Sequence, residues 1–217
     1  MEGIVYKVQS YLESSKLLFT YTPKGKITLI AKGAQKLNSN DRILGQYLNH
    51  ISFEEMPGKE MYTLKSAKLI HDFAHIKNDF EDTKKCASML EIIDKAIKAD
   101  ENHELIFTML TRGLSSKNLE YSQLSFALKV LDIIGYGINL EADGRKIKGL
   151  SLSEARLIYL NEDLSYDLSL EQTIHLLKLQ KMPFEDLESL NLETKSIHTF
   201  IKKYYEYHLN IQLKTFV

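Results

Sequence analysis

The spacing of apolar residues changes near Phe73, and this change restricts the fold more than any other feature of the sequence. Before it, apolar and polar residues alternate with a period of two, which is typical of strands with one buried face. After it, apolar residues recur every three or four positions, which indicates amphipathic helices. The sequence therefore predicts an α+β protein, with a β domain over residues 1–77 and an α-helical domain over residues 78–217.

Five strands are expected in the β domain, each bounded by residues that favour turns. Pro23-Lys-Gly-Lys26 supplies the turn between the second and third strands. The expected strands cover residues 4–9, 16–22, 27–32, 45–56 and 61–70. Five strands in about 75 residues fit a small closed barrel better than a seven-stranded sandwich. We expect a Greek-key barrel of the oligonucleotide-binding (OB) type.

The helical domain is expected to be a bundle. Residues 122–134 are apolar nearly all round, which is typical of a helix in the middle of a bundle. Phe80 and Leu105 belong to the apolar stripes of two other helices and should point inward. The helix of Phe80 begins near Asn78, and the helix of Leu105 begins near Asn102. A further helix begins at a capping box formed by Ser169 and Gln172, and the last one covers residues 193–209. Residues 138–150 are polar and basic and are expected to form a short loop.

Charge is distributed unevenly along a chain whose formal net charge is only −1. Residues 1–78 carry 11 basic and 7 acidic side chains, a net charge of +4, whereas residues 79–144 carry 7 and 12, a net charge of −5. A basic surface on a neutral protein is typical of polyanion binding, although a solvated, lysine-rich sheet face is the common alternative. Lysines in the β domain are interleaved with Tyr6, Phe19, Tyr21, Tyr47, Phe53 and Tyr62. Flat rings beside cations suit single-stranded nucleic acid, but some of these rings must fill the barrel.

No motif in the sequence indicates catalysis or a resident metal. His71 and His75 have the spacing of helical zinc ligands, but they fall at the end of a strand and lack the accompanying glutamate. Cys86 is the only cysteine and is expected to be a small core residue. We find no nucleophile elbow, P-loop or dinucleotide-binding glycine motif. We therefore expect a protein that is not an enzyme and has neither a metal nor another cofactor.

The apolar residues also indicate where the protein acts. No stretch approaches 18 uncharged apolar residues, so no membrane span is expected. Glu2 stands where a signal peptide would be basic, and no long apolar segment follows it. We expect a cytoplasmic protein that does not bind a membrane.

A set of short motifs follows a fixed order along the chain. They are Gly3-Ile-Val, Glu13-Ser-Ser-Lys16-Leu-Leu, Thr22-Pro-Lys-Gly-Lys26, Ala31-Lys-Gly-Ala34, Tyr62-Thr-Leu-Lys-Ser-Ala67, the Gly-Tyr helix end at residues 131–137, Gly149-Leu-Ser151, Tyr205-Glu-Tyr-His-Leu209 and Leu213-Lys-Thr. Their order and spacing resemble the RecO family of bacterial recombinational DNA-repair mediators.

This resemblance implies a protein that binds single- and double-stranded DNA and anneals complementary strands. It also implies partnership with RecR, contact with the acidic C-terminal tail of single-strand-binding protein, and a part in loading RecA. The tail would need a groove in the helical domain that has one or two cations. Basic residues of the β domain are the expected DNA contacts, although strand alternation turns about half of them elsewhere. They are Lys7, Lys16, Lys24, Lys26, Lys32, Lys36, Arg42 and Lys65.

The chain departs from the family pattern in two places. Many members hold a four-cysteine zinc module between the Gly-Tyr helix end and the Gly-Leu-Ser segment, whereas here residues 137–149 contain no cysteine. We therefore expect the module to be lost and replaced by a shortened loop. The loop after Ala34 is usually richer in arginine, so DNA binding is expected to be weaker or more sensitive to salt.

Two other functions fit the same residues. The first is an OB-type RNA-binding protein, such as a tRNA or ribosome factor, which competition between DNA and RNA oligomers would distinguish. The second is a protein-only adaptor, which would bind no oligonucleotide in a salt-dependent way. An enzyme would require a pocket with a convergent histidine–carboxylate pair.

Overall fold

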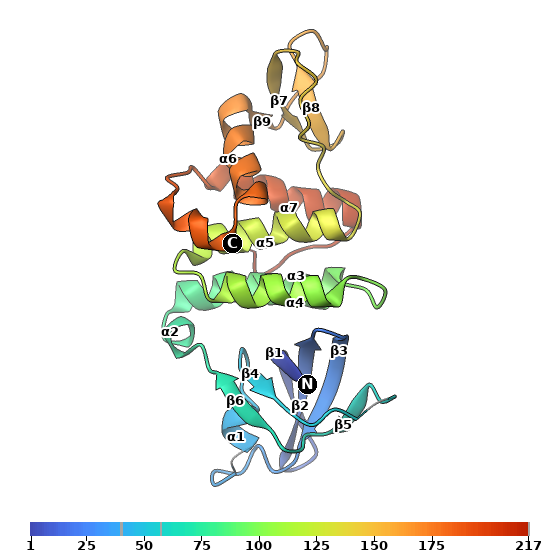
Figure 1. The fold of residues 1–217 in the computed structure, drawn as a ribbon, viewed down its shortest axis with the longest axis vertical. Coiled ribbons are helices and arrows are strands. Elements are labelled where there is room, and N and C mark those ends of the chain that lie inside the picture. The colour runs from blue at the N-terminus through green and yellow to red at the C-terminus, as the bar shows by residue number, and fades with distance from the viewer. Residues whose placement is uncertain (40, 57, 217) are drawn as a thin grey trace. The chain divides into compact units, whose positions relative to one another are not determined.

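The computed structural model describes residues 1–39, 41–56 and 58–216, and the chain divides into two compact units (Figure 1). The first unit comprises Met1–Phe80 and Lys98–Thr108, and the second comprises Glu81–Ile97 and the residues from Met109 onward. The first unit thus contains the predicted β domain together with a segment from later in the chain. Among the described residues, no helix is long and apolar enough to cross a membrane.

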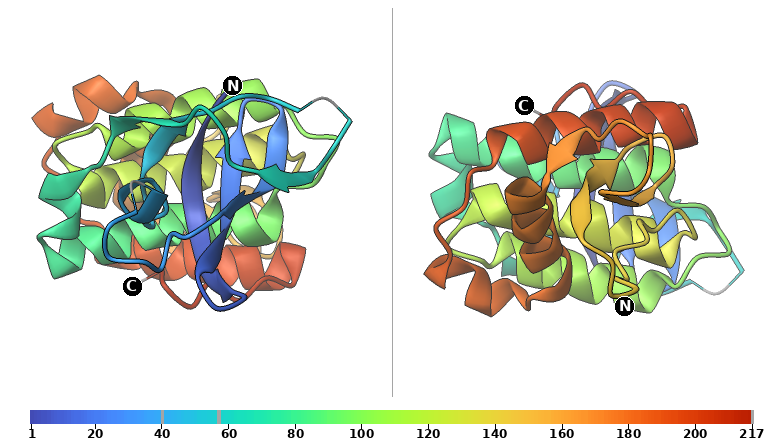
Figure 2. Two further views of the ribbon diagram at one scale, coloured as in Figure 1. Left: turned by 90° about the horizontal axis from the view of Figure 1, so that it is seen from below. Right: turned by 90° about the horizontal axis from the view of Figure 1, so that it is seen from above.

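A six-stranded sheet forms the first unit, with the strand order β5-β3-β2-β1-β4-β6. The pairs are antiparallel except β3–β5, which is parallel, and the sheet curls on itself (Figure 2). Up to residue 77, the elements of the first unit are, in chain order, β1 (Glu2–Tyr11), β2 (Ser15–Thr22), β3 (Gly25–Ala31), the short helix α1 (Asp41–Leu44), β4 (His50–Ser52), β5 (Met61–Thr63), β6 (Lys68–His71) and the short helix α2 (Ala74–Lys77). The predicted OB-type fold followed by helices is confirmed.

Two of the expected strands were wrong in extent. The fourth shortens from residues 45–56 to His50–Ser52, because Leu48 has a positive φ of 67° and the chain turns before it. The expected fifth strand is broken at Ser66, whose φ is 51°, into β5 and β6. These pieces are the two edges of the sheet, so one kinked segment joins both edges. The Leu64 N–H donates to the Ile30 carbonyl at 3.0 Å on one side of the kink.

Both faces of the sheet bury apolar residues. The inner face holds Val5, Leu18, Leu29, Ala31, Ala34, Ile51, Phe53, Tyr62 and Leu64. On the outer face, Ile4 pairs with Tyr21 and with His50 in adjacent strands. Residues 98–108 cover this row: the His103 Nδ1 lies 3.1 Å from the Tyr21 hydroxyl, and the Phe107 ring lies 5.8 Å from that of His50. Burial raises the pKa of Tyr21 and lowers the pKa of His50.

Helices make up most of the second unit. Helix α5 is buried nearly all round, as predicted, and it contacts α6, α7 and the 3-10 helix η1. The expected capping box opens α6: the Gln172 N–H donates to the Ser169 Oγ, and the Ser169 N–H donates to the Gln172 Oε1. The helices after α2 are α3 (Phe80–Ala96), α4 (His103–Leu114), α5 (Leu119–Ile133), α6 (Leu170–Lys181), η1 (Phe184–Ser189) and α7 (Lys195–Leu209).

The inward direction expected for two helical residues was wrong. Phe80 is 72% exposed and Leu105 is 45% exposed. On α3 the first buried residue is Cys86, so Phe80 lies in an exposed first turn, and on α4 the buried stripe begins at Ile106, one residue after Leu105. Ile106 and Leu110 are fully buried on α4.

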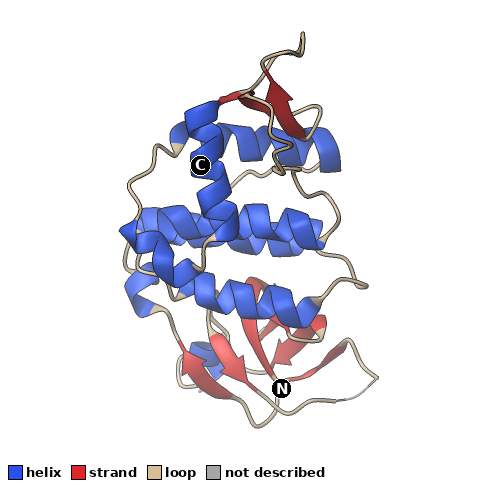
Figure 3. Cartoon of the chain, turned by 45° about the horizontal axis from the view of Figure 1, so that its top comes forward, coloured by secondary structure: helices blue, strands red, loops and turns tan. Residues whose placement is uncertain are grey.

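A small sheet replaces part of the loop expected over residues 138–150. Strands β7 (Ile147–Ser151), β8 (Arg156–Tyr159) and β9 (Leu168–Ser169) are antiparallel in the order β8-β7-β9 (Figure 3). The loop prediction failed because these strands are too short to show a period. Gly149 permits the pairing: a Cβ there would lie 2.3 Å from the Leu168 carbonyl oxygen.

Candidate nucleic-acid interface

A β-bulge in β1 turns Lys7 onto the outer face of the sheet. Val5 pairs with Thr20, but the register shifts between Val5 and Lys7, so that Lys7 pairs with Phe19. Directly paired residues share a face of the sheet. The Lys7 Nζ therefore lies over the half-buried Phe19 ring, 5.1 Å from its centroid. This contact holds a cation beside a flat apolar surface.

An open depression of about 660 Å³ lies at one end of this face, where the β1–β2 turn meets the loop after β3. Its sides are the turn residues Tyr11 and Leu12 and the loop residues Lys32 and Lys36. The complete lining is Tyr11, Leu12, Ser14, Ser15, Ile30, Lys32, Gly33, Lys36 and Thr63. We call it the Lys32/Lys36 depression. None of its lining residues is acidic, so its charge is positive.

The motif Ala31-Lys-Gly-Ala34 builds the lysine side of the depression. Ala31 and Ala34 are fully buried in the inner core, and Gly33 takes a φ of +72°, which favours glycine. The two alanines anchor the loop on the core, while Lys32 and Lys36 stay exposed. The spacing of the small residues in this motif is thus a consequence of where the loop must touch the core and where it must turn.

The other predicted DNA contacts fall into three groups. Lys26 pairs with Tyr21 and lies on the same sheet face as Lys7. Arg42 and Lys65 are exposed, on α1 and just after β5. The remaining two are engaged within the unit: the Lys24 Nζ lies 2.8 Å from the Glu55 carboxylate, and the Lys16 Nζ donates to the Gly45 carbonyl at 3.4 Å.

The structure therefore brings together a subset of the predicted residues. Lys32 and Lys36 share one depression, whereas Lys7 and Lys26 lie on the outer face of the sheet, with Lys26 at the end of β3 away from the depression. Lys16 has the register of Ala31, whose side chain lies in the core, so it belongs to the opposite face. Contact between any of these residues and DNA stays a prediction. Leu12 also lines the depression but was not among the predicted contacts, because its only signal in the sequence is a large apolar residue in a turn.

Most of the aromatic residues considered as stacking surfaces have a packing role. Tyr6, Tyr21, Phe53 and Tyr62 are at most 8% exposed, so they fill the unit. On α7, Tyr204 and Tyr205 are buried, and their hydroxyls donate to the carbonyls of Tyr136 and Ala127. The rings of His71 and His75 are 6.2 Å apart, and the described residues hold no group of three or more side chains that could ligate a metal.

A second hollow, of about 320 Å³, lies in the second unit beside the first turns of α7. The buried side chains of Leu152, Leu168 and Phe200 form its apolar floor. The exposed Lys195 and Lys203 stand on its rim. We call it the α7 groove. Its one acidic residue, Asp167, is engaged, because its carboxylate accepts a hydrogen bond of 2.7 Å from the Leu152 N–H.

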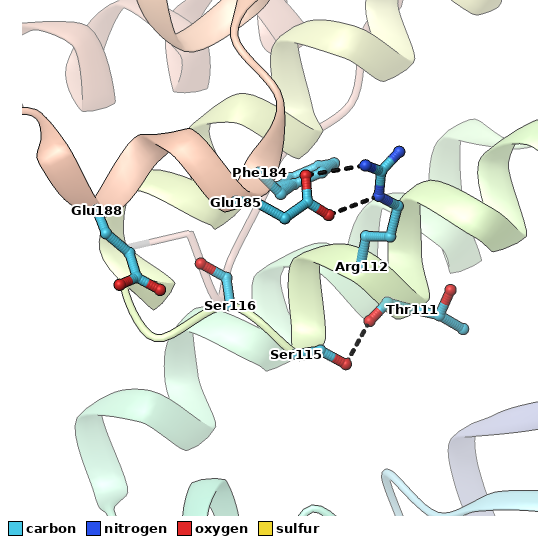
Figure 4. A pocket seen from close by; sticks show the side chains of 7 residues that line it. All are labelled: Thr111, Arg112, Ser115, Ser116, Phe184, Glu185 and Glu188. Carbon is cyan, nitrogen blue, oxygen red and sulfur yellow. Dashed lines mark hydrogen bonds and ion pairs between the residues drawn. The ribbon is translucent and has the colours of Figure 1, made fainter.

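In another hollow of this unit, of about 310 Å³, two charged lining residues pair with each other (Figure 4). Arg112 donates two hydrogen bonds, of 2.7 and 2.9 Å, to the carboxylate of Glu185. The Ser115 hydroxyl donates to the Thr111 carbonyl. These groups satisfy one another, so the hollow offers little to a charged ligand.

The fold and the Lys32/Lys36 depression define an OB-type barrel protein with a basic surface. Residues 1–73 match the family model described as Recombination protein O N terminal. The chain is 30% identical over 148 residues to the DNA repair protein RecO of Clostridium kluyveri, covering 64% of this chain and 56% of the relative. It is 32% identical over 145 residues to the DNA repair protein RecO of Clostridium perfringens, covering 64% and 59%.

A third relative, the DNA repair protein RecO of Clostridium acetobutylicum, is 30% identical over 145 residues, covering 64% of this chain and 59% of the relative. The family-model match and these relatives support the resemblance to the RecO family that the motifs indicated. The aligned part spans less than two thirds of the length of these curated relatives.

Proposed function

We propose that this chain is a DNA-binding recombination mediator that is not an enzyme. It binds single- and double-stranded DNA on the outer face of β1–β3 and anneals complementary strands. With RecR, it helps to load RecA onto DNA coated with single-strand-binding protein. The observation that carries the proposal is the Lys32/Lys36 depression, which is lined by two exposed lysines and the exposed Tyr11 and by no acidic residue.

The chemistry of the proposal is electrostatic. Each ammonium group that meets a phosphate releases condensed counterions, which favours binding and makes it dependent on salt. Two strands held on one basic surface repel each other less, so the barrier to their pairing falls. Such annealing needs no catalytic residue.

A titration of the chain with fluorescently labelled single-stranded DNA at two salt concentrations tests the proposal. If Lys7, Lys26, Lys32 and Lys36 each meet one phosphate, the log–log salt slope should be about −3, at roughly −0.7 per contact. Duplex DNA and RNA of the same sequence serve as competitors. A lack of binding at low salt would contradict the proposal and leave the protein-only adaptor, whereas a strong preference for RNA would favour the RNA-binding alternative.

We further propose that the α7 groove holds the acidic C-terminal tail of single-strand-binding protein. The apolar floor fits an apolar end residue, and Lys195 and Lys203 suit neighbouring carboxylates. The two lysines are eight residues apart on α7, so they lie on one side of the helix and flank the floor.

Charge reversal at the groove is expected to weaken binding of an acidic peptide with an apolar C-terminal residue. Lys195→Glu with Lys203→Glu should lower its affinity about tenfold or more, because two attractive contacts become repulsive. Peptide fluorescence anisotropy measures the change. Lys195→Glu with Lys202→Glu is the matched control: Lys202 is exposed on the same helix but does not line the groove, so this pair should lose less. Equal losses would contradict the placement of the tail.

A further inference from the structure

Leu12 occupies a position that folding does not account for. It is 77% exposed and has a positive φ of 52°, in the turn between β1 and β2. Exposure of a leucine gains nothing from the hydrophobic effect, and a positive φ is unfavourable for its side chain. Asparagine or glycine would suit the turn better. A side chain that is costly in two ways indicates a use outside the fold.

The turn that carries Leu12 is firmly held. The Gln35 side-chain amide donates to the Ser15 carbonyl at 2.7 Å, and the Gln35 N–H donates to the Ser14 carbonyl at 2.9 Å. These bonds tie the turn to the loop of Lys32 and Lys36. The turn of Leu12 is therefore held beside the loop of both lysines, and all three residues line the same depression.

We propose that Leu12 is a wedge that inserts between neighbouring bases of a strand bound in the Lys32/Lys36 depression. The inference rests on the proposed DNA binding and adds the mode in which bases are held. Lys32 and Lys36 hold the phosphates, and the bases of the same nucleotides then reach Tyr11 and Leu12 on the other side of the depression. Proteins that part stacked bases insert an apolar side chain between them, and Tyr11, 37% exposed beside Leu12, offers a ring for one of the parted bases.

The consequence concerns pairing. A single strand in solution stacks on itself, and this stacking must be disrupted before its bases can pair in a new register. A wedge opens the stack at one step while leaving the hydrogen-bonding edges of the bases free. The occupant is thus a single-stranded oligonucleotide with exposed base edges, rather than an intact duplex.

Leu12→Asn isolates this role. Asparagine tolerates a positive φ, so the turn should fold as well as in the wild type or better. The probe is a single-stranded DNA oligomer that contains 2-aminopurine between adenines, whose fluorescence rises when stacking is lost. Binding of the wild type should raise the fluorescence, and Leu12→Asn should lose most of that rise. Its affinity should fall roughly fivefold with an unchanged salt slope, since one apolar contact to a base is removed and no phosphate contact.

Leu37→Asn is the matched control. Leu37 is also 77% exposed and lies beside Lys36, but it does not line the depression, so its replacement should leave the fluorescence rise intact. The wedge is overturned if Leu12→Asn keeps the rise, or if Leu37→Asn loses as much. A wild type that binds the oligomer without any rise would also overturn the wedge and leave the proposed function standing. A wild type that does not bind it would overturn both.

Discussion

Replacement of Lys32 and Lys36 by glutamate is expected to lower the affinity for single-stranded DNA by about 10- to 100-fold at low salt. Both side chains are exposed on one loop and line one depression, so both should meet the same stretch of phosphates. The log–log salt slope should become shallower by about 1.4, since two contacts at roughly 0.7 each are lost. Anisotropy titrations at 50 and 200 mM salt, about the range over which such contacts are sensitive, measure both quantities.

A charge-matched double variant separates a local site from a change in overall charge. Lys178→Glu with Lys202→Glu alters the net charge by the same amount on exposed residues of the second unit. This pair should reduce DNA affinity far less than the change at Lys32 and Lys36. If the two double variants lose affinity equally, the Lys32/Lys36 depression is not the DNA site.

Gly149→Val is expected to lower the free energy of unfolding by about 2–3 kcal/mol, through overpacking at a closely packed site. A Cβ at residue 149 would lie 2.3 Å from the Leu168 carbonyl oxygen and 2.8 Å from the Tyr166 ring, so β7 and β9 must move apart. Leu152 directly follows β7 and Leu168 is the first residue of β9, and both belong to the floor of the α7 groove. Peptide binding should therefore fall, while DNA binding in the first unit should persist.

Urea unfolding followed by circular dichroism, together with the peptide and DNA titrations, measures these effects. Lys146→Val introduces the same side chain one position before β7 and is expected to change stability by less than about 0.5 kcal/mol, because Lys146 is exposed. Wild-type stability in Gly149→Val would contradict the argument. Loss of DNA binding along with peptide binding would show that the damage spreads beyond the small sheet.

The sequence was most informative where one local rule decides the outcome. The capping box at Ser169 and Gln172 opens α6 as expected, and the apolar residues of α5 predict its burial on all sides. The turn at Pro23-Lys-Gly-Lys26 joins β2 to β3 as expected. Each of these features depends on residues that are close in the sequence, so period and turn chemistry suffice.

The predictions were wrong where a residue or strand far away in the sequence determines the local structure. The period of two in β1 assigns Lys7 to the face of Val5, but the bulge moves Lys7 to the other face, and only pairing with β2 shows the bulge. In the sequence Lys24 resembles any other exposed lysine, and only the fold shows that it pairs with Glu55, 31 residues later. Likewise, the three short strands of the second unit exist because β7 finds β8 and β9, and none carries a recognisable pattern alone.

The composition of the first unit has a consequence for how the chain acquires its fold during synthesis. Residues 98–108 cover the row of Ile4, Tyr21 and His50, yet they follow the whole of α3 in the chain. A nascent chain that has reached only Phe80 therefore carries every strand of the large sheet with part of its apolar surface still facing water. The ribosome must deliver the start of α4 before that surface is covered, so the barrel matures after the first long helix has been made.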